Sequence, residues 1–303
     1  MKTGVRLEAV PTRLYDYEVV CGSTEGYTYP KVFEIDRSAT VKNQHDISAC
    51  AAFAYATILE HIFNKRMSEG FIYATLRAES DKQPGMFVTR LLDLAVKIGA
   101  VPLSAFGVLL EMPEVREFLK KFPELLNVAL PFRIKGFAGI NHANLEKRHQ
   151  AVQHALTHNL TAEGKHIPLL AVSETYFGEP HAIVLRGWND ETKKYIIQNS
   201  WGTEWGDGGY AEVPHKAIDA IYVIYPEDIV LPFKDVSDKD WFFKDVKNAF
   251  FTGLIKGTTD TTFEPNKPVT RAESAAMLNR HAKKDDDEHE RIWRAINEIK
   301  DML

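Results

Sequence analysis

One of the two cysteines stands where a thiol can be activated. Cys50 opens an apolar segment with three- and four-residue spacing, which predicts a helix over residues 48–67. The unpaired N–H groups and the dipole at a helix N-terminus favour negative charge, so they lower the pKa of a thiol there. Nothing near Cys21 supplies a base. Cys50 is therefore the candidate nucleophile, and we expect Cys21 to be inert.

A nucleophilic thiol also needs oxyanion donors and a base. Gln44 lies six residues before Cys50 and could donate through its side-chain amide to an oxyanion near the thiol. The backbone N–H of Cys50 could be the second donor. Histidine is the usual base, and the chain has eleven histidines to choose from.

Three segments resemble the papain family of cysteine peptidases. The segment VKNQHDISACAAFA (41–54) is similar to the family's sequence around its nucleophile. HAIVLRGW (181–188) resembles the family's histidine strand. NSWGTEWGDGGY (199–210) matches the signature N-S-W-G-x-x-W-G-x-x-G-Y at every fixed position.

The resemblance implies a role for five residues. His181 and Asn199 follow Cys50 by 131 and 149 positions, and these offsets are those of the papain group. By the resemblance Cys50 is the nucleophile, His181 its base and Asn199 the residue that orients the base. Gln44 helps to form the oxyanion hole, and Trp201 shields the histidine–asparagine hydrogen bond from water.

The resemblance spans about residues 30–225 and implies an α+β fold. That fold has two lobes, a helical left lobe and a β-barrel-like right lobe, with the active site in the cleft between them. The residue pattern agrees, because a helical first half is followed by short β-branched and aromatic runs. We expect helices at 48–67, 86–98 and 145–158, and strands within 168–176, 181–188, 194–201 and 220–226.

The chain departs from the family pattern around the nucleophile. His45 replaces a glycine, Ala51 replaces a tryptophan, and Ile47 replaces a disulfide cysteine, while Ser48 and Ala49 replace a Gly-Ser pair. The loss of the disulfide fits a chain that folds without oxidation. The changes at His45 and Ala51 alter the wall that would face a substrate.

Two alternatives to a cysteine endopeptidase remain open. One is a catalytically impaired papain scaffold that only binds, which the changes at His45 and Ala51 keep open. The other is a Cys–His cell-wall amidase, although such an enzyme would not require Gln44 or the N-S-W-G run. For the endopeptidase we expect a protein or peptide substrate.

Residues 233–280 resemble an S-layer homology domain. The matching features are an F-x-D-V opening, Trp241, a G-L-I-K-G turn, F-E-P and a T-R-A-E run, in which Thr270 is a suitable helix N-cap. The resemblance implies attachment to a bacterial secondary cell-wall polysaccharide. Arg271 and Trp241 are the candidate polymer-binding residues, because guanidinium pairs well with anionic groups. Arg271 could equally tie the module together.

These resemblances divide the chain into four parts. We expect residues 1–29 to pack on the peptidase, 30–228 to form the papain-like domain, 233–280 the S-layer homology domain, and 281–303 a charged stretch with a terminal helix. In that helix Ile292, Ile296, Ile299 and Leu303 follow coiled-coil spacing. The helix could form a homotrimer or pack on its own module.

Composition and charge exclude some classes of protein. The hydrophobic content of 45% and the charged content of 26% are those of a globular protein. The net charge of -5 argues against nucleic acid, which needs a basic surface. No apolar run approaches the roughly 18 residues of a membrane span. Residues 1–20 contain no apolar h-region, so we see no signal peptide. The module predicts a cell-surface or extracellular location; the alternatives are cytoplasmic or phage-associated.

Neither a cofactor nor a metal is predicted. No pair of histidines stands in an H-E-x-x-H setting. We expect the histidines on polar segments to be solvated, namely His142, His149, His154, His158 and His166.

Overall fold

The computed structural model describes residues 5–6, 15–21, 24, 26–37, 40–75, 85–107, 123–226, 231–251, 255–259 and 261–279. They form two compact units. The first unit contains the described residues from 24 to 226 together with residues 5–6. The second contains residues 15–21 and the described residues from 231 onwards.

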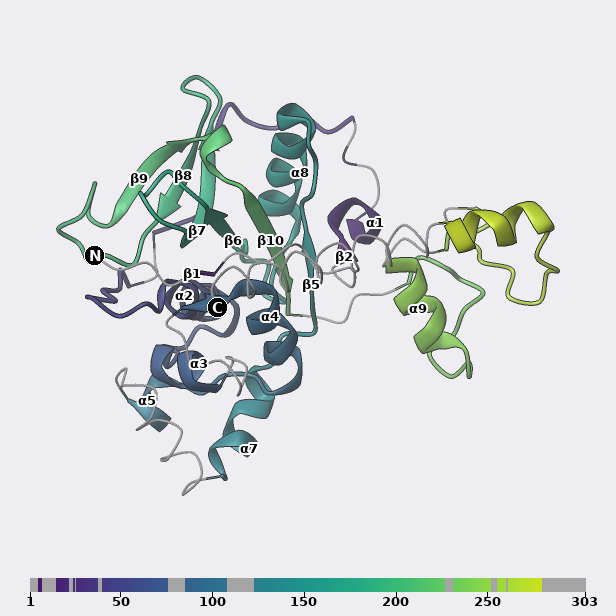
Figure 1. The fold of residues 1–303 in the computed structure, drawn as a ribbon, viewed down its shortest axis with the longest axis horizontal. Helices are drawn as coiled ribbons and strands as arrows, with labels where there is room; N and C mark the ends of the chain where they lie inside the picture. Colours follow the sequence, from purple (N-terminus) through teal and green to yellow (C-terminus); the bar gives the residue numbers. More distant parts are fainter. Residues whose placement is uncertain are drawn as a thin grey trace, which may run out of the picture. The chain divides into compact units, whose positions relative to one another are not determined.

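Five helices form one lobe of the first unit. They are α2 (Cys50–Phe63), α3 (Glu69–Thr75), α4 (Val88–Lys97), α5 (Leu103–Phe106) and α7 (Leu125–Ala129), the last followed by the 3-10 helix η1 (Leu130–Phe132). Figure 1 shows α3, α5 and α7 below the sheet. Their shared core contains Phe71, Val101, Leu125 and Ala129. Apolar side chains from α3, α7 and the segment between α4 and α5 thus form this core.

An antiparallel sheet forms the other lobe. Its strands lie in the order β5-β10-β6-β7-β8-β9, and β3 pairs with the free part of β7. The strands are β3 (Val32–Glu34), β5 (Gly136–Gly139), β6 (Leu169–Ser173), β7 (His181–Asn189), β8 (Lys194–Gln198), β9 (Tyr210–Pro214) and β10 (Ala220–Tyr225). Among the described strands no pairing joins β9 to β5, so the sheet is open. The α+β, two-lobed prediction is confirmed, with an open sheet where a barrel-like one was expected.

Helix α8 (Leu145–His158) lies against β7 and has the predicted bounds. It begins where Asn144 Oδ1 accepts hydrogen bonds from the N–H groups of Glu146 and Lys147, at 2.9 and 3.1 Å. The 3-10 helix η2 (His215–Ala217) also contacts α8. A side-chain cap at the N-terminus therefore sets the start of this helix.

Two predicted helices are shorter than expected. Helix α2 ends at Phe63, because Asn64 takes the left-handed conformation that terminates helices (φ 50°). Helix α4 begins at Val88, because the two preceding residues form strand β4 (Met86–Phe87), which pairs with β1 (Val5–Arg6). Pairing between distant segments thus replaces the first turn that local spacing predicts.

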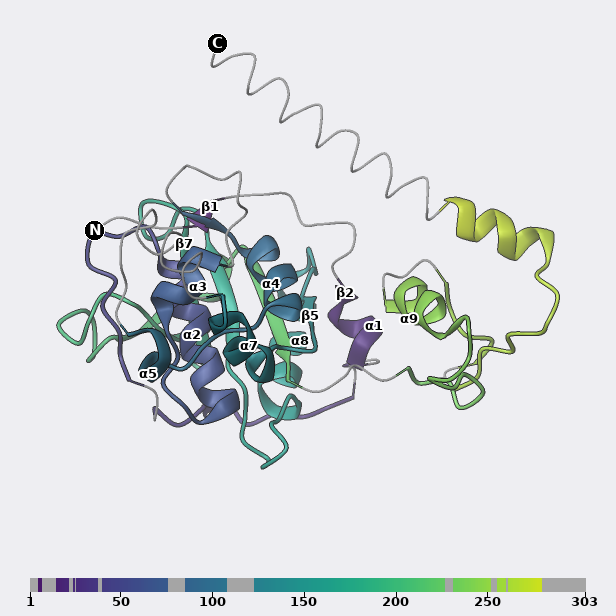
Figure 2. The ribbon, with the colours of Figure 1, turned by 90° about the horizontal axis from the view of Figure 1, so that it is seen from below.

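Strand β7 connects the two lobes. Helix α2 packs against it, and Figure 2 shows the helices in front of the strands when the unit is seen from their side. The buried Arg186 of β7 donates to Gln198 Oε1 at 2.9 Å and to the backbone oxygen of Ile35 at 3.2 Å. The guanidinium therefore ties β7 to β8 and to the segment after β3.

The second unit contains β2 (Tyr15–Asp16), α1 (Tyr17–Cys21), α9 (Phe243–Phe251) and a helical stretch over residues 271–279. Helix α1 contacts α9. The Asp235 carboxylate accepts hydrogen bonds from Phe263 N–H at 2.9 Å and Glu264 N–H at 2.7 Å. The aspartate of the F-x-D-V opening therefore holds the F-E-P segment in place.

The predicted N-cap at Thr270 is confirmed. Thr270 Oγ1 accepts from Glu273 N–H at 3.2 Å, while Glu273 Oε2 accepts from Thr270 N–H at 2.8 Å. These reciprocal bonds form a capping box, which starts the helical stretch at residue 271.

The domain predictions for the two ends of the chain remain predictions. Residues 15–21 group with the second unit and residues 5–6 with the first, so the described parts of the 1–29 segment divide between the units. The terminal helix and its coiled-coil seam at 281–303 lie outside the described residues. None of the helices in the described part of the chain has the length and apolar character needed to cross a bilayer.

Candidate active site

The candidate nucleophile and the candidate base meet where two elements begin. Cys50 is the first residue of α2 and His181 the first residue of β7. The backbone N–H of Ala182 donates to Cys50 Sγ at 3.4 Å, so the thiol lies beside the residue that follows His181. Both side chains are fully buried. The packing of α2 on β7 thus brings together two residues that are far apart in sequence.

Asn199 fixes the orientation of the His181 imidazole. His181 Nε2 lies 2.8 Å from Asn199 Oδ1, and the same oxygen accepts from Ser200 N–H at 2.7 Å. Because an amide nitrogen could not accept that second bond, the oxygen faces the imidazole and Nε2 carries the proton. Nδ1 keeps its lone pair, and it has no hydrogen-bond partner among the described residues. Nδ1 is therefore the atom that can take a proton from the thiol.

Backbone and side-chain bonds hold Gln44 beside the same segment. Gln44 N–H donates to Ser200 O at 2.9 Å, and Gly202 N–H donates to Lys42 O at 2.9 Å. The Gln44 side chain accepts from Ser200 Oγ at 2.6 Å and donates to Ile47 O at 2.8 Å. The amide is therefore fixed at both ends, close in sequence to the start of α2.

An aromatic cluster encloses the imidazole. The Trp201 ring lies 4.6 Å from His181 between ring centroids, and the Phe177 ring lies 5.2 Å from it. Phe177 also packs edge-on against Trp201 at 5.7 Å. Sequence reasoning did not single out Phe177, because it lies in a turn between strands where no periodic pattern marks it. The rings of Trp201 and Phe177 leave the His181–Asn199 hydrogen bond in an apolar setting.

Burial sets the charge of His181. It lowers the pKa of the imidazole to about 4, although the hydrogen bond to Asn199 opposes the shift. The imidazole is consequently neutral at pH 7. At Cys21, burial raises the pKa of the thiol to about 12. A thiolate is therefore disfavoured at Cys21 at any physiological pH.

The replacement at His45 has a backbone consequence. His45 has a φ of 51°, in the left-handed region that glycine adopts at no steric cost. The glycine that the family has at this position would adopt this conformation without strain. This chain keeps the same turn although the residue is a histidine. The His45 side chain is exposed, and the backbone N–H of His45 donates to Asn43 Oδ1 at 2.8 Å. Ala51, the second replacement, is fully buried in α2.

The prediction that the remaining histidines are solvated is partly wrong. His154 is only 5% exposed, and His149 and His166 are half-buried. His154 follows the buried Ala151 by three residues, so it shares the face of α8 that packs inward. The sequence analysis expected His154 to be solvated because it lies in a polar segment, and it did not place this residue on the buried face.

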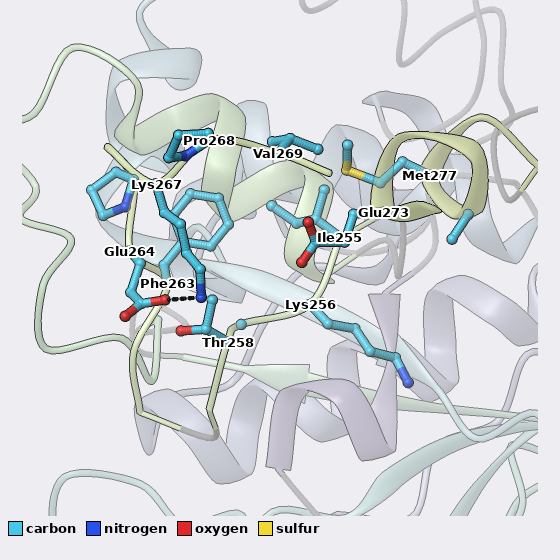
Figure 3. A pocket seen from close by; sticks show the side chains of 13 residues that line it. Ile255, Lys256, Thr258, Phe263, Glu264, Lys267, Pro268, Val269, Glu273 and Met277 are labelled. Carbon is cyan, nitrogen blue, oxygen red and sulfur yellow. Dashed lines mark hydrogen bonds and ion pairs between the residues drawn. The ribbon is translucent and has the colours of Figure 1, made fainter. Parts of the chain in front are cut away.

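The second unit, called the C-terminal unit below, has a pocket of about 320 Å³. Figure 3 shows Glu264 and Lys267 paired beside Phe263, with Val269 and Met277 also lining the pocket. The Lys267 Nζ–Glu264 Oε2 distance is 2.7 Å. The two predicted polymer-binding residues lie outside this lining. Arg271 is exposed, and Trp241 is 88% exposed.

Two family models match the chain. The model of the papain family cysteine protease matches residues 134–222, and the S-layer homology domain model matches residues 232–275. The first match includes His181 and Asn199 but begins after Cys50 and Gln44. The placement of those two residues therefore depends on the sequence motif and on the contacts above.

Curated relatives match over short segments. An uncharacterized peptidase C1-like protein of Acanthamoeba polyphaga mimivirus is 42% identical over 38 residues, which is 12% of this chain and 12% of the relative. An endoglucanase of a Bacillus species (strain KSM-635) is 43% identical over 49 residues, which is 16% of this chain and 5% of the relative. The chain thus spans only a small part of the curated relatives it matches.

A solved structure supports the fold across most of the chain. Xylellain, a cysteine protease from Xylella fastidiosa, superposes with a TM-score of 0.54 at 18% identity, covering 74% of this chain and 96% of xylellain. At that identity the likeness establishes the fold alone. Together with the two family models, it shows a region similar to the papain family of cysteine proteases, followed by a region similar to S-layer homology domains.

Proposed function

We propose that the chain is a cysteine-type endopeptidase that hydrolyses peptide bonds through a thioester acyl-enzyme. The observation that carries the proposal is the arrangement at the start of β7. There, Asn199 leaves His181 Nδ1 as the proton acceptor, and the N–H of Ala182, the residue after His181, donates to Cys50 Sγ at 3.4 Å. Such a base next to a thiol at a helix N-terminus is the requirement for a nucleophilic cysteine.

Acylation begins with transfer of the thiol proton. The proton moves from Cys50 Sγ to His181 Nδ1, and the two new charges stabilise each other even though burial disfavours either one alone. Sγ then attacks the peptide carbonyl, and the backbone N–H of Cys50 and the Gln44 amide stabilise the oxyanion. Collapse of this intermediate breaks the C–N bond, and imidazolium returns its proton to the leaving amine.

Deacylation uses the same groups in reverse. Neutral His181 takes a proton from water, the hydroxide attacks the thioester carbonyl, and the oxyanion forms again beside Gln44. The C–S bond breaks, and the thiolate of Cys50 regains its proton from His181. Asn199 keeps one tautomer throughout, and Trp201 and Phe177 keep water from its hydrogen bond to the imidazole.

The second part of the proposal concerns attachment. We propose that the C-terminal unit binds a bacterial secondary cell-wall polysaccharide and holds the peptidase at the cell surface. The match to the S-layer homology domain model supports this. Arg271 and Trp241 are exposed and carry the chemistry for anionic sugars, a guanidinium and an aromatic face. The chain's substrate would then be protein or peptide at or beyond the wall.

Steady-state hydrolysis of a fluorogenic dipeptide tests the catalytic proposal. Cys50→Ala should abolish turnover, Asn199→Ala should reduce it and leave some activity, and Cys21→Ala, the matched control, should retain it. Unchanged turnover in Cys50→Ala would remove the proposal. Release of amino sugars or stem peptides from peptidoglycan without any dipeptide cleavage would favour the amidase instead. No turnover of any substrate by the unaltered chain would favour an impaired scaffold.

A further inference from the structure

Three side chains that could bind a metal ion converge at the end of β7 remote from the active site. His149 lies on α8, Asp190 follows β7, and His215 begins η2. Each residue offers one ligand atom, and these atoms all lie within 4.8 Å of one another. His149 Nε2 is 2.8 Å from Asp190 Oδ1. This is the one such group found among the described residues, and the peptidase chemistry does not use it.

The orientation of both imidazoles is fixed by packing. The His149 and His215 rings stack with centroids 4.1 Å apart and 23° between their planes. His215 also stacks on Tyr195 at 4.2 Å. Arg148 donates to the backbone oxygen of His215 at 3.1 Å, which anchors that residue to α8. The two rings therefore present their edges together without further ordering of the chain.

An imidazole nitrogen of this group is buried without a partner. His215 Nε2 has no hydrogen-bond partner among the described residues, although it is shielded from solvent. A buried polar atom that makes no hydrogen bond is costly, and a metal ion would satisfy it. The backbone of Lys194 hydrogen-bonds to the His215 side chain, and Gln153 Nε2 donates to Asp190 Oδ2 at 3.2 Å. Such outer contacts orient the ligands of metal sites.

The chemistry of the three donors indicates the class of metal. Two imidazoles and one carboxylate suit Zn²⁺ and similar transition metals better than Mg²⁺ or Ca²⁺, which prefer oxygen ligands.

We propose that His149, Asp190 and His215 form a binding site for a Zn²⁺-class divalent transition metal. In tetrahedral zinc sites neighbouring ligand atoms lie about 3.3 Å apart, since each is about 2.0 Å from the metal. The present spacings run from 2.8 Å between His149 and Asp190 to at most 4.8 Å, and side-chain rotations would bring them to that value. The ion would take the place of the proton between His149 and Asp190 and would clip α8 and η2 to the end of β7.

The site is separate from the catalytic one. Asp190 follows His181 by nine residues along an extended strand, which at about 3.3 Å per residue is about 30 Å. The proposal therefore departs from our sequence-based expectation of no metal, which considered only H-E-x-x-H spacing. It does not depend on the chain being a peptidase. A metal held here would stabilise the sheet lobe without contacting the reacting atoms.

The test measures Zn²⁺ binding to the full, untagged chain carrying Cys50→Ala, because the catalytic thiol and imidazole could themselves bind zinc. Calorimetry should give one Zn²⁺ per chain, and Zn²⁺ should raise the melting temperature. Asp190→Asn and His215→Gln should each weaken binding at least about tenfold, because each removes one of three ligands. The matched control is His158→Gln, from the stacked His154–His158 pair (4.2 Å) on the same helix. That variant should bind Zn²⁺ as the parent does.

Two further measurements make the test decisive. Melts without metal identify a variant that has merely lost its fold, and the Co²⁺ spectrum of the parent chain then reports the ligands directly. The proposal predicts the absorption of low-coordinate nitrogen and oxygen ligands without a thiolate charge-transfer band. A thiolate band would assign the metal to Cys21 and overturn the proposal. No Zn²⁺ binding, or equal weakening in the His158→Gln control, would also overturn it.

Discussion

The two units keep their polar groups in opposite settings. In the first unit His181, Asn199 and Gln44 are at most 3% exposed, and the imidazole of the candidate base is enclosed by aromatic rings. In the C-terminal unit the residues that carry recognition chemistry are open to solvent, and Trp241 is 88% exposed. The first unit holds His181, Asn199 and Gln44 through buried hydrogen bonds, whereas the second exposes its candidate recognition groups on a surface.

The difference follows from what each proposed task needs. Proton transfer and oxyanion stabilisation depend on groups fixed to fractions of an ångström in a site without water. A long polymer at a cell surface has to reach its binding groups from solvent. The same types of side chain should therefore matter for activity and stability in the first unit, and for binding alone in the second. The predictions below test that division.

Removal of residues 233–303 is expected to have the largest effect. The truncated chain should no longer pellet with bacterial wall preparations, because the whole recognition surface is gone. Its cleavage of a small fluorogenic peptide should be unchanged, since all candidate catalytic groups lie in the first unit. Pelleting assays and kinetics on both chains measure this. Equal pelleting of the two chains would contradict the anchoring proposal. Loss of cleavage would show that the activity of the first unit depends on the second.

Two lysines, one in each unit, test the effect of burial on an ion pair. Lys42 is 5% exposed and lies 2.6 Å from Glu60, and it also pairs with Glu69. Lys42→Met should destabilise the chain by about 3–5 kcal/mol, because it leaves buried carboxylates without their cation. Lys267 pairs with Glu264 at 2.7 Å, but both side chains are about half exposed. Lys267→Met should leave stability unchanged within error.

Urea unfolding of the two lysine variants measures this difference. The buried network also supports Gln44, two residues after Lys42, so Lys42→Met should lower peptide turnover as well. A result in which both variants lose the same stability would mean that burial does not distinguish the units in the way proposed.

The pH dependence of stability provides a smaller test. The folded-state pKa of His181 is about 4, below its ordinary value of 6.5. The unfolded chain consequently binds more protons between these values, so the stability that neutral His181 supports is complete above pH 6.5 and is lost as the pH falls towards 4. The shift corresponds to about 3 kcal/mol.

The variant His181→Gln isolates this effect from that of the other buried histidines. Unfolding free energies of the parent and the variant should converge or cross as the pH is lowered from 7 to 4, with the parent falling more steeply. Parallel curves would mean that His181 is not held neutral by burial.

The sequence predicted the parts of the fold that local patterns encode. The bounds of α8 follow from its apolar spacing and from Asn144, and β7 begins at His181 as expected. Helix α4 starts later than predicted because Met86 pairs with Val5, a contact between segments 81 residues apart that local spacing cannot show. Motif resemblance located the candidate catalytic residues, whose contacts the structure then supplied.

Features built by tertiary packing alone escaped prediction. Phe177 lies against His181 because the turn before β7 folds back, and no periodicity marks such a turn. His149, Asp190 and His215 are separated by 41 and 25 positions and belong to three elements, so only the packed sheet brings them together. The buried face of α8 carries His154 and Gln153 among apolar residues, and an apolar pattern alone does not show that these two polar side chains are buried with them.

The central claim is that burial and hydrogen bonding make Cys50, and not Cys21, the reactive thiol. Labelling with an epoxide-type thiol inhibitor, followed by peptide mapping in a mass spectrometer, tests it most directly. The account predicts one adduct per chain on Cys50, no adduct in Cys50→Ala, and full labelling in Cys21→Ala. An adduct on Cys21, or undiminished labelling of Cys50→Ala, would contradict it.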